Sequence, residues 1–307
     1  MAVTLTEAAK LSNDALLVGI IEETIKECPL LQEMPFIEIV GNALTYNREN
    51  TLPSAEWHAA NDDWVTSPSP DFSQQTATLK ILGQNADVDD YIKQTRSNVQ
   101  DIEAAIIELT AKAVRHELED KFIYGDSSSD ANQFDGLCKI IDTGSAGTQV
   151  IAMAATGATL TLAKLDQLID AILGGKPDML MMSRRSRRKI NALARAAGSN
   201  LEVGQGKLGE FVQLYNGIPI AINDFILDTH TLSGSVETAY TAGANSTIYA
   251  FQFGEAGLCG VSSPGLMQAE PIGPMETKNA QRTRIKWYVS LALFSTKKAA
   301  ALIGVQD

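Results

Sequence analysis

Residues 124–137 carry the loop sequence YGDSSSDANQFDGL, and the longest amphipathic segment of the chain leads directly into it. That segment keeps an apolar stripe made of Val99, Ile102, Ile106, Leu109 and Ala113. Steps of three and four residues place all of these side chains on one face of a helix. We expect one helix of about 28 residues, roughly 42 Å long, that ends at Gly125 as its C′ glycine. A helix of that length suits a strut.

Composition points to a folded, acidic protein. The chain has 307 residues, of which 45% are hydrophobic and 20% charged, so it can bury the core of one large domain or of two smaller ones. It holds 25 Lys and Arg against 37 Asp and Glu, a net charge of −12. Such a surface repels phosphate backbones, which argues against general nucleic-acid binding but leaves room for a local basic patch.

The cysteines and the N-terminal region indicate the compartment. Cys28, Cys138 and Cys259 lie far apart and form no C-x-x-C pair, so we expect buried thiols in a reducing compartment. The longest apolar run near the N-terminus covers only residues 15–21, too few for a signal peptide or a membrane span. We therefore expect synthesis in the cytoplasm and no membrane partner.

A polar arm interrupts the first half of the chain at residues 47–75. It contains three prolines and no regular period, and a loop of this length inside a compact domain is uncommon and usually functional. Strand patterns at 36–40, 43–46 and 76–82 predict a long two-stranded hairpin that projects the arm. The arm carries Trp57 and Trp64, and Trp is enriched among interface anchors. We interpret both rings as docking groups; the alternative is that they fold back onto their own domain.

The remaining segments predict a mixed order of helices and strands. We expect helices at 6–27, 160–173 and 184–197, a flexible glycine-rich loop at 198–209, and a strand or helix at 299–305. Strands are expected at 178–183, 218–222, 246–253, 258–263 and 283–294. This order indicates an α+β fold of two subdomains, with the long helix at their seam.

A basic cluster opens the helix predicted at 184–197. It comprises Arg184, Arg185, Arg187, Arg188 and Lys189. A solvated helix face that offsets the acidity of the chain explains this cluster, and an intersubunit contact is the alternative; the net charge makes phosphate a weaker candidate.

No pattern in the sequence supports catalysis. Gly204–Gly209 matches G-x-G-x-x-G, but a dinucleotide site needs a strand before the motif and a helix after it, and a strand pattern follows instead. A nucleotide-dependent enzyme that uses this loop remains an alternative. His58, His116 and His230 are isolated from one another and from any cysteine pair. We expect no enzymatic activity, no metal and no cofactor.

Four stretches in order resemble a known family. They are 76–91 (TATLKILGQNADVDDY), 95–137 with its Gly-Asp and Gly-Leu pairs, 178–193, and 215–224 (YNGIPIAIND) with Gly217 and Pro219. Over residues 35–305 this order is similar to the major capsid proteins of tailed bacteriophages, which have the HK97-type fold. The resemblance implies a long spine helix, an extended β-hairpin arm (the E-loop) and a mixed α/β axial domain.

The resemblance also implies a division of the chain. Residues 1–35 would form an N-terminal helix or arm, and 36–91 the extended hairpin. Residues 92–150 and 265–307 would form the peripheral domain with the spine helix, and 151–264 the axial domain.

The implied function is that of a major capsid protein. Copies would form hexamers and pentamers of an icosahedral head, located in the virion and assembled in the host cytoplasm, around double-stranded DNA that is not bound specifically. Trp57, Trp64, Arg184, Arg185, Arg187 and Arg188 are the candidate interface residues. An encapsulin-type nanocompartment shell is the alternative within the same fold.

Two departures from some members of that family lead to further expectations. About 35 residues precede the first strands, so we expect a separate scaffolding protein. The resemblance also implies a portal as a partner, and it leaves open whether decoration proteins are present. Lys80 is the only lysine between Lys26 and Lys93, and it falls in a strand pattern rather than at the arm tip. We therefore expect no covalently cross-linked shell.

Overall fold

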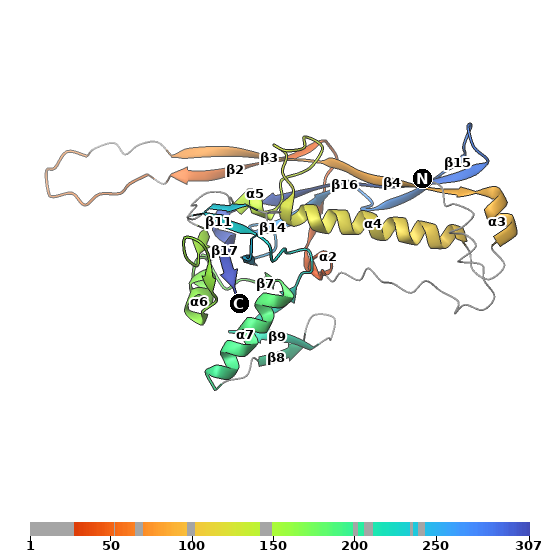
Figure 1. Ribbon diagram of the computed structural model, residues 1–307. Helices are drawn as coiled ribbons and strands as arrows, with labels where there is room; N and C mark the ends of the chain where they lie inside the picture. Colours follow the sequence, from red (N-terminus) through yellow and green to blue (C-terminus); the bar gives the residue numbers. More distant parts are fainter. Residues whose placement is uncertain are drawn as a thin grey trace.

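The computed structural model describes most of the chain, namely residues 28–51, 53–64, 70–96, 102–141, 149–198, 202–205, 211–233, 236–238 and 243–307. The helix predicted at 6–27 and Val99 of the predicted stripe lie outside these residues. Figure 1 shows an elongated molecule in which a long hairpin and a long helix extend from a more compact body. The described residues form a mixture of helices and strands, as the sequence predicts.

A five-stranded sheet forms the elongated part of the molecule. Its strands are β1 (Phe36–Glu38), β4 (Lys80–Asp89), β14 (Leu258–Ser262), β15 (Gln268–Pro274) and β16 (Ala280–Leu293). The 14 residues of β16 are the centre of this sheet, because they pair antiparallel with β4, β14 and β15. The sheet runs beside the long helix, and α3 (Asp90–Arg96) follows β4 at its far end (Figure 1).

The long helix is α4 (Ile102–Tyr124), whose 23 described residues span roughly 34 Å. Its buried face differs from the predicted stripe, since Leu109 is 44% exposed and Ala113 is also exposed. Burial moves from Ile102 and Ala105 to Val114 and then continues along the last turns of the helix. Val114 lies nine positions after Ala105, so its side chain points in a direction rotated by about 180° around the helix axis. The stripe prediction is confirmed for Ile102 and Ile106 and wrong for Leu109 and Ala113, because α4 packs against different parts of the molecule at its two ends.

An eight-stranded sheet organises the compact body. Its strands are β5 (Val150–Ala152), β6 (Ala158–Thr159), β7 (Met179–Met182), β8 (Glu202–Gln205), β9 (Phe211–Tyr215), β10 (Ile218–Ile222), β13 (Ser246–Phe251) and β17 (Ala299–Gln306). Two helices, α6 (Leu162–Asp170) and α7 (Arg184–Ala196), contribute Leu165, Leu168 and Ile190 to the core on one face of this sheet. Alternate strand residues such as Met179, Met181 and Tyr249 enter a second core on the other face.

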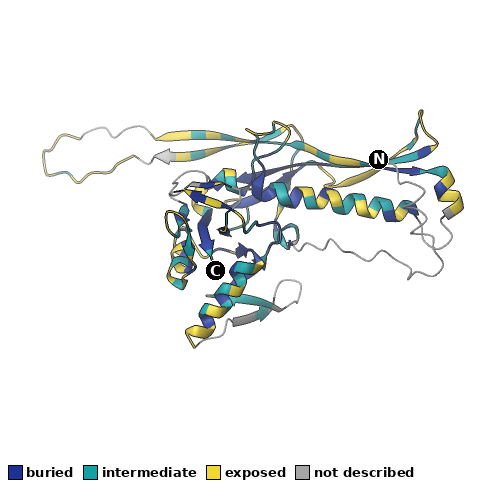
Figure 2. Cartoon of the chain, viewed as in Figure 1, coloured by how far each residue is buried: buried dark blue, intermediate teal, exposed yellow. Residues whose placement is uncertain are grey.

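That second core joins the two sheets. It contains Leu118 and Phe122 of α4 together with Trp287 and Leu291 of β16, as well as the alternate residues of the eight-stranded sheet. The short helices α2 (Leu30–Glu33) and α5 (Leu137–Ile141) also contribute side chains to it. Figure 2 shows burial concentrated where the end of α4 meets the body. The spine helix is therefore anchored at its C-terminal end, as a strut must be.

Most predicted elements are present, with three differences. The predicted strand 76–82 is divided, because β3 (Asp71–Thr78) ends before Leu79 and β4 begins at Lys80. The predicted flexible loop 198–209 contains strand β8, which pairs with β9. The C-terminal segment 299–305, expected in the peripheral domain, is strand β17 and pairs with β13 of the eight-stranded sheet. Strand β14, expected in the axial domain, pairs with β16 of the five-stranded sheet. Sheet membership thus crosses the expected domain boundary between residues 264 and 265.

The loop 125–136 holds the end of α4 through backbone hydrogen bonds. The N–H of Gly125 donates to Lys121 O at 2.8 Å, and the N–H of Gly136 donates to Gly125 O at 2.9 Å. Gly125 ends the helix as predicted, but its φ is not in the left-handed region, so it is not a left-handed C′ residue. Glycine is needed there for space, since a Cβ would lie 2.4 Å from Phe134 O and 2.5 Å from Lys121 O.

Candidate assembly surfaces

The arm is an extended β-hairpin. Strands β2 (Ala43–Thr51) and β3 (Asp71–Thr78) pair antiparallel from Ala43 opposite Thr78 outward to Thr51 opposite Asp71. Figure 1 shows this hairpin leaving the body as a two-stranded ribbon. Regular pairing therefore extends into both ends of the segment 47–75, which the sequence predicted to lack structure.

Side chains on β2 lock the base of the hairpin to the end of β16. The Tyr46 hydroxyl donates to Leu293 O at 2.9 Å, and Arg48 Nε donates to Phe294 O at 3.0 Å. The rings of Tyr46 and Phe294 meet edge to face at 4.8 Å. Burial of the phenol raises the pKa of Tyr46 above its usual value. Because Ala77 on the other strand packs against Cys259, Val261 and Ala292, the base is fixed on both strands.

The described arm tip, residues 53–64, presents both tryptophans to solvent. Trp57 is 102% exposed and Trp64 is 82% exposed. The ring of His58 stacks on Trp64 at 4.3 Å, which holds that indole within the tip. The alternative in which both rings fold back onto their own domain is therefore wrong for this structure. Isolated exposed apolar side chains are common, but two tryptophans on one projecting tip form an unusual surface.

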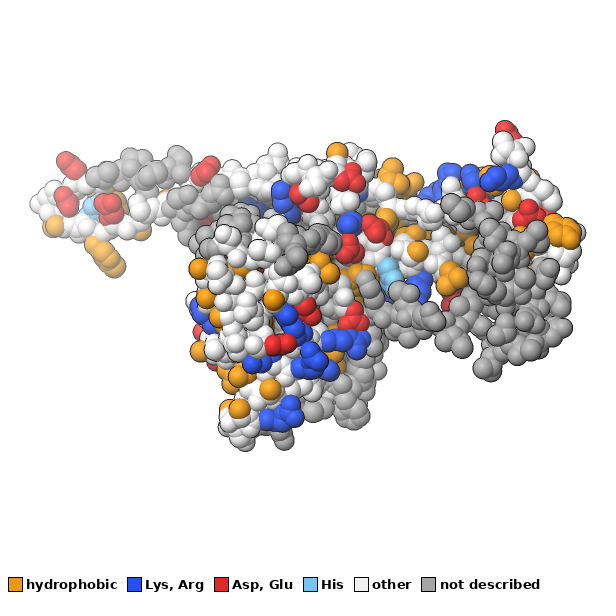
Figure 3. Space-filling model, in the orientation of Figure 1, with side chains coloured by type: hydrophobic (Ala, Val, Ile, Leu, Met, Phe, Trp, Pro, Cys, Tyr) orange, Lys and Arg blue, Asp and Glu red, His pale blue; other side chains and the backbone are white. Residues whose placement is uncertain are grey.

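The arm is uniformly acidic. Between residues 49 and 79 the sequence has no Lys or Arg, and it holds Glu49, Glu56, Asp62, Asp63 and Asp71. Figure 3 shows acidic side chains at the far end of the arm, beside apolar ones. The tip thus combines aromatic area with negative charge.

The basic cluster on α7 is partly engaged within its own chain. Ser183 caps this helix, and Arg184 forms a bidentate pair with Asp224 at 2.6 and 2.8 Å. Arg185 donates to Ala244 O at 2.9 Å and lies 3.5 Å from Asp228. Figure 3 shows Lys and Arg side chains gathered on the surface near α7. The prediction of a purely solvated helix face is therefore too simple, because two of the arginines tie α7 to neighbouring loops.

Arg187 and Arg188 complete that cluster. Arg188 is exposed, whereas Arg187 is half-buried and its Nε has no hydrogen-bond partner among the described residues. A contact between subunits through either side chain stays a prediction.

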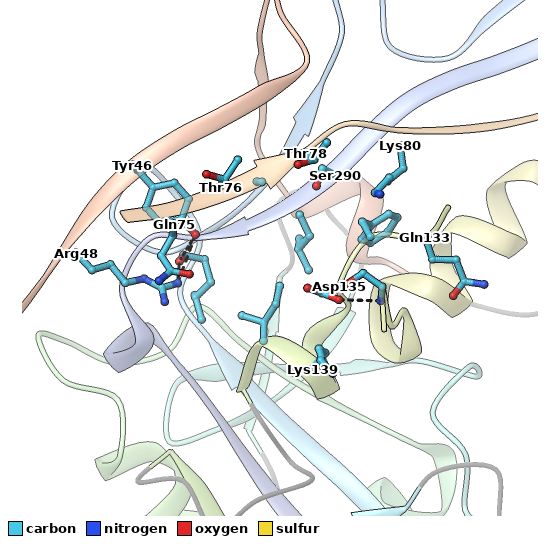
Figure 4. A pocket seen from close by; sticks show the side chains of 16 residues that line it. Tyr46, Arg48, Gln75, Thr76, Thr78, Lys80, Gln133, Asp135, Lys139 and Ser290 are labelled. Carbon is cyan, nitrogen blue, oxygen red and sulfur yellow. Dashed lines mark hydrogen bonds between the residues drawn. The ribbon is translucent and has the colours of Figure 1, made fainter. Parts of the chain in front are cut away.

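A cleft of about 420 Å³ lies at the base of the arm, between the hairpin, β16 and the loop 125–136. We call it the basal cleft. Figure 4 shows Arg48 and Tyr46 on one side of it and Lys80, Gln133 and Lys139 on the other. Sequence reasoning missed this site because its residues come from four separate segments and share no motif.

A buried polar cluster connects α4 to the body. The Tyr124 hydroxyl lies 2.8 Å from His230 Nε2 and accepts a hydrogen bond from Leu227 N at 2.9 Å. His230 Nδ1 contacts the carboxylate of Glu237, which also accepts from Thr247. His230 and Glu237 are both buried, and their hydrogen bonds make this cluster a structural connection between α4 and the body.

Two residues of the glycine motif at 204–209, Gly204 and Gln205, lie within the described part of the chain. Gly204 and Gln205 belong to β8, and the next described element is the antiparallel strand β9. A Cβ on Gly204 would lie 2.5 Å from Leu214 Cδ1, so close packing within the hairpin requires glycine there. A dinucleotide site would need a helix N-terminus after the motif. Gly206–Gly209 lie outside the described residues, so the alternative of a nucleotide site stays a prediction.

The described residues contain neither a group that could hold a metal ion nor a helix that could span a membrane. Within these parts of the chain, no group of three or more His, Cys, Asp or Glu side chains is arranged to hold a metal ion. Among the described helices, none is both long enough and apolar enough to cross a membrane.

Comparison with solved structures establishes the fold. The holo-SrpI encapsulin of Synechococcus elongatus PCC 7942 is similar with a TM-score of 0.71 and 17% identity, over 100% of this chain and 97% of that chain. The capsid of an empty GTA particle has a TM-score of 0.65 and 15% identity, over 98% of both chains. The capsid of Myoviridae phage XM1 has a TM-score of 0.66 and 11% identity, over 95% of this chain and 97% of that chain. The chain has the HK97-type fold that the sequence resemblance predicts.

Sequence comparison adds the family. No curated protein sequence matches the chain. The model of the phage capsid family matches residues 12–257, which is most of the chain. That span includes the arm, the spine helix and the basic helix α7. The chain therefore belongs to the phage capsid family.

Proposed function

We propose that this protein is the structural subunit of an icosahedral phage head, in which copies associate as hexamers and pentamers around double-stranded DNA. The observation that carries the proposal is the arm, whose base is fixed to β16 and whose tip exposes two tryptophans. Membership of the phage capsid family supports a shell role and a place in the virion.

The arm is suited to a contact between subunits because its tip buries almost nothing on its own chain. One Trp side chain can bury roughly 150–250 Å², worth about 4–6 kcal/mol before the costs of ordering. In an assembled shell the same rings would become interface anchors, whose truncation typically costs about 2 kcal/mol or more. The fixed base lowers the entropy lost on docking, since the ribbon is already oriented.

Charge supports a shell that encloses DNA without holding it tightly. The net charge of −12 disfavours strong attraction to phosphates. A scaffolding protein, a portal and a decoration protein would be further partners, with assembly in the host cytoplasm. Lys80 lies at the base of the arm, where it donates to Ala131 O at 2.6 Å, and no lysine lies between it and the tip. We therefore propose a shell without covalent cross-links, and a ladder of covalent oligomers from particles on a denaturing gel would contradict this.

An encapsulin-type compartment is the second candidate function. The likeness to the Synechococcus elongatus encapsulin, with a TM-score of 0.71 over the full chain, favours it. The contents of purified particles distinguish the two functions by mass spectrometry. An enzyme cargo would support the compartment, whereas DNA or a scaffolding protein would support the phage head.

Electron microscopy of the purified chain at rising concentration tests the proposal. We expect capsomer rings for the wild type alone, because closed shells would also need the proposed scaffolding protein, and we expect loss of the rings for the double variant Trp57→Ala, Trp64→Ala. The matched control is Leu173→Ala, which removes another exposed apolar side chain far from the arm in sequence. Both variants should unfold at the wild-type temperature, because none of these side chains is part of the core. Undiminished assembly of the double tryptophan variant would refute the role given to the arm.

A further inference from the structure

The basal cleft has the dimensions of a site for a small molecule. Its volume of about 420 Å³ lies within the range of roughly 300–1,000 Å³ that is usual for such sites. Part of its wall is apolar and includes Phe134, Ile140 and Leu291, and the rest carries hydroxyl groups, amides and charges. A ligand that combines a compact apolar body with a polar group therefore suits the lining.

Ser290 points separately to a ligand. This residue of β16 is only 4% exposed, and its hydroxyl makes no hydrogen bond within the described part of the chain. A buried hydroxyl without a partner is costly, and most such groups in folded proteins are satisfied. Because Ser290 lines the cleft, an acceptor oxygen on a ligand would satisfy it (Figure 4).

Two side chains at the root of the hairpin lie close to Ser290. Lys80 pairs with Val289, the residue before Ser290, and Thr78 precedes Lys80 by two positions. Lys80 and Thr78 both line the cleft, and Figure 4 shows them near Ser290. The Lys80 ammonium donates to Ala131 O at 2.6 Å and has further N–H groups. One ammonium and two hydroxyls can therefore donate to the same oxyanion.

The charges along the cleft favour an anion. Arg48, Lys80 and Lys139 line it, whereas Asp135 is the one acidic side chain among the described lining residues. In the described part of the chain neither Arg48 nor Lys80 has a carboxylate partner, while Lys139 lies 3.2 Å from Asp126. An anionic group in the cleft would therefore meet uncompensated positive charge.

Phosphate fits these groups better than carboxylate does. A planar carboxylate is bound best by a bidentate guanidinium, but Arg48 already donates to the carbonyl oxygens of residues 293 and 294. Lysine binds phosphate as a point charge, and a phosphate has acceptor oxygens for several donors at once. Thr78, Lys80 and Ser290 belong to three different strands, β3, β4 and β16, which suits a tetrahedral group.

We propose that the basal cleft binds a small phosphate monoester whose body is apolar or aromatic. Its phosphate would accept hydrogen bonds from Lys80, Thr78 and Ser290, and its body would lie against the apolar part of the wall. This inference goes beyond the proposed shell function and does not depend on it. Because Thr78 belongs to the hairpin and Ser290 to β16, a bound ligand would also link the root of the arm to the five-stranded sheet.

Titration calorimetry of the full-length subunit with phenyl phosphate tests the site. We expect saturable binding of one ligand per chain with a dissociation constant below about 1 mM, which a ligand of this size can reach. Inorganic phosphate lacks the apolar body and phenol lacks the charge, so each should bind at least about tenfold more weakly. Equal affinities for phenyl phosphate and inorganic phosphate would mean an adventitious ion only and would overturn the proposal. Absence of saturable binding of phenyl phosphate up to about 10 mM would overturn it as well.

Adenosine monophosphate and glucose 6-phosphate distinguish two sources of the same phosphate group. The base of the nucleotide presents a ring to the apolar part of the wall, whereas the sugar presents hydroxyl groups. We therefore expect the nucleotide to bind more tightly in the same titration. Tighter binding of glucose 6-phosphate would overturn the assignment of an apolar or aromatic body.

Single substitutions locate the site within the cleft. Ser290→Ala removes a hydroxyl that makes no hydrogen bond in the described fold, and Lys80→Met removes a charge while it keeps most of the side chain. Each should weaken the binding of phenyl phosphate by about tenfold, since a hydrogen bond to a charged group has about that effect. The matched control, Lys164→Met on α6, removes an ammonium that is not among the lining residues and should stay within about twofold of the wild type. Circular dichroism melting checks the fold of each variant, and wild-type affinity in both Ser290→Ala and Lys80→Met would overturn the site.

Hydrogen exchange tests the link between the arm and the sheet. Phenyl phosphate should slow the exchange of amide hydrogens in residues 76–80 of the wild type, and this effect should be lost in Ser290→Ala. Unchanged exchange in the wild type despite binding would overturn the link. The shell function has its own readout by electron microscopy, so absence of rings together with intact binding of phenyl phosphate would count against that function alone.

Discussion

Replacing Gly136 by alanine should damage the junction between the spine helix and its following loop. The N–H of Gly136 donates to Gly125 O at 2.9 Å, and its carbonyl accepts from Ile140 N at 2.9 Å. A Cβ at Gly136 would lie 2.6 Å from Lys121 O, 2.7 Å from Gly125 N and 2.8 Å from Ile123 O. All three atoms belong to the backbone at the end of α4, so no side chain can turn away to make room.

The expected loss of stability follows from that crowding. Overpacking a well-packed site costs about 1–3 kcal/mol, and the backbone contacts place Gly136→Ala near the upper end. The unfolded chain has less conformational entropy with alanine than with glycine, which stabilises the folded state by about 0.4–1 kcal/mol and offsets part of this loss. The net loss is therefore about 2 kcal/mol. At roughly 2–4 °C per kcal/mol for a large domain, the melting temperature should fall by about 4–8 °C.

Scanning calorimetry of Gly136→Ala beside Gly198→Ala measures this effect. Gly198 has φ +73° and nothing within 4 Å of an added Cβ, so alanine there has only the left-handed backbone cost. That cost is roughly 1–2 kcal/mol and the same entropy term offsets part of it. We expect the Gly136 variant to lose at least twice as much stability. Equal shifts in melting temperature would show that the space around Gly136 does not restrain the junction.

Two further predictions concern polar contacts. Tyr124→Phe removes the hydroxyl that contacts buried His230 and the N–H of Leu227. The free energy of unfolding, measured by urea titration, should therefore fall by about 1–3 kcal/mol. An unchanged value would contradict the contact. The hydrogen bonds from Arg282 hold the pKa of Asp87 below its usual value. This pair therefore stabilises the fold at pH values above the unfolded pKa of about 4. The stabilisation is lost as the pH falls through the lower pKa of the folded state. Asp87→Asn should therefore lower the melting temperature at about pH 7 and much less at about pH 2, and an equal loss at both pH values would argue against the pair.

Local signals allowed much of the fold to be predicted. The helices α6 and α7 begin where Thr161 and Ser183 cap them, and each cap is visible in the sequence as a hydroxyl residue before a periodic segment. The fully buried strand β7 appears as a continuous apolar run. These elements follow from their own residues, which is why their bounds could be placed to within about three residues.

Features that depend on distant partners could not be predicted. Leu109 continues the apolar spacing of the spine helix, yet it is exposed because the buried side of α4 rotates between its two ends. Gly204 indicated a flexible loop, but pairing of β8 with β9 makes it part of a strand. The basal cleft is a stronger case, because Arg48 and Lys139 meet only through the tertiary fold. The docking role of the two exposed tryptophans stays a prediction, and the sequence indicates no surface that would receive them.

The acidic residues beside the tryptophans solve a problem that any exposed docking group creates. Two uncovered indoles on a projecting ribbon would favour association between arms, and neighbouring carboxylates oppose it because two tips of like charge repel each other. The same carboxylates favour a surface where cations such as Arg48 and Lys80 lack carboxylate partners among the described residues. Repulsion between tips and attraction to a cationic surface would thus come from one set of charges. In the proposed shell, Asp62 and Asp63 would oppose contacts between two tips, while Trp57 and Trp64 would supply the contact area with a neighbouring subunit.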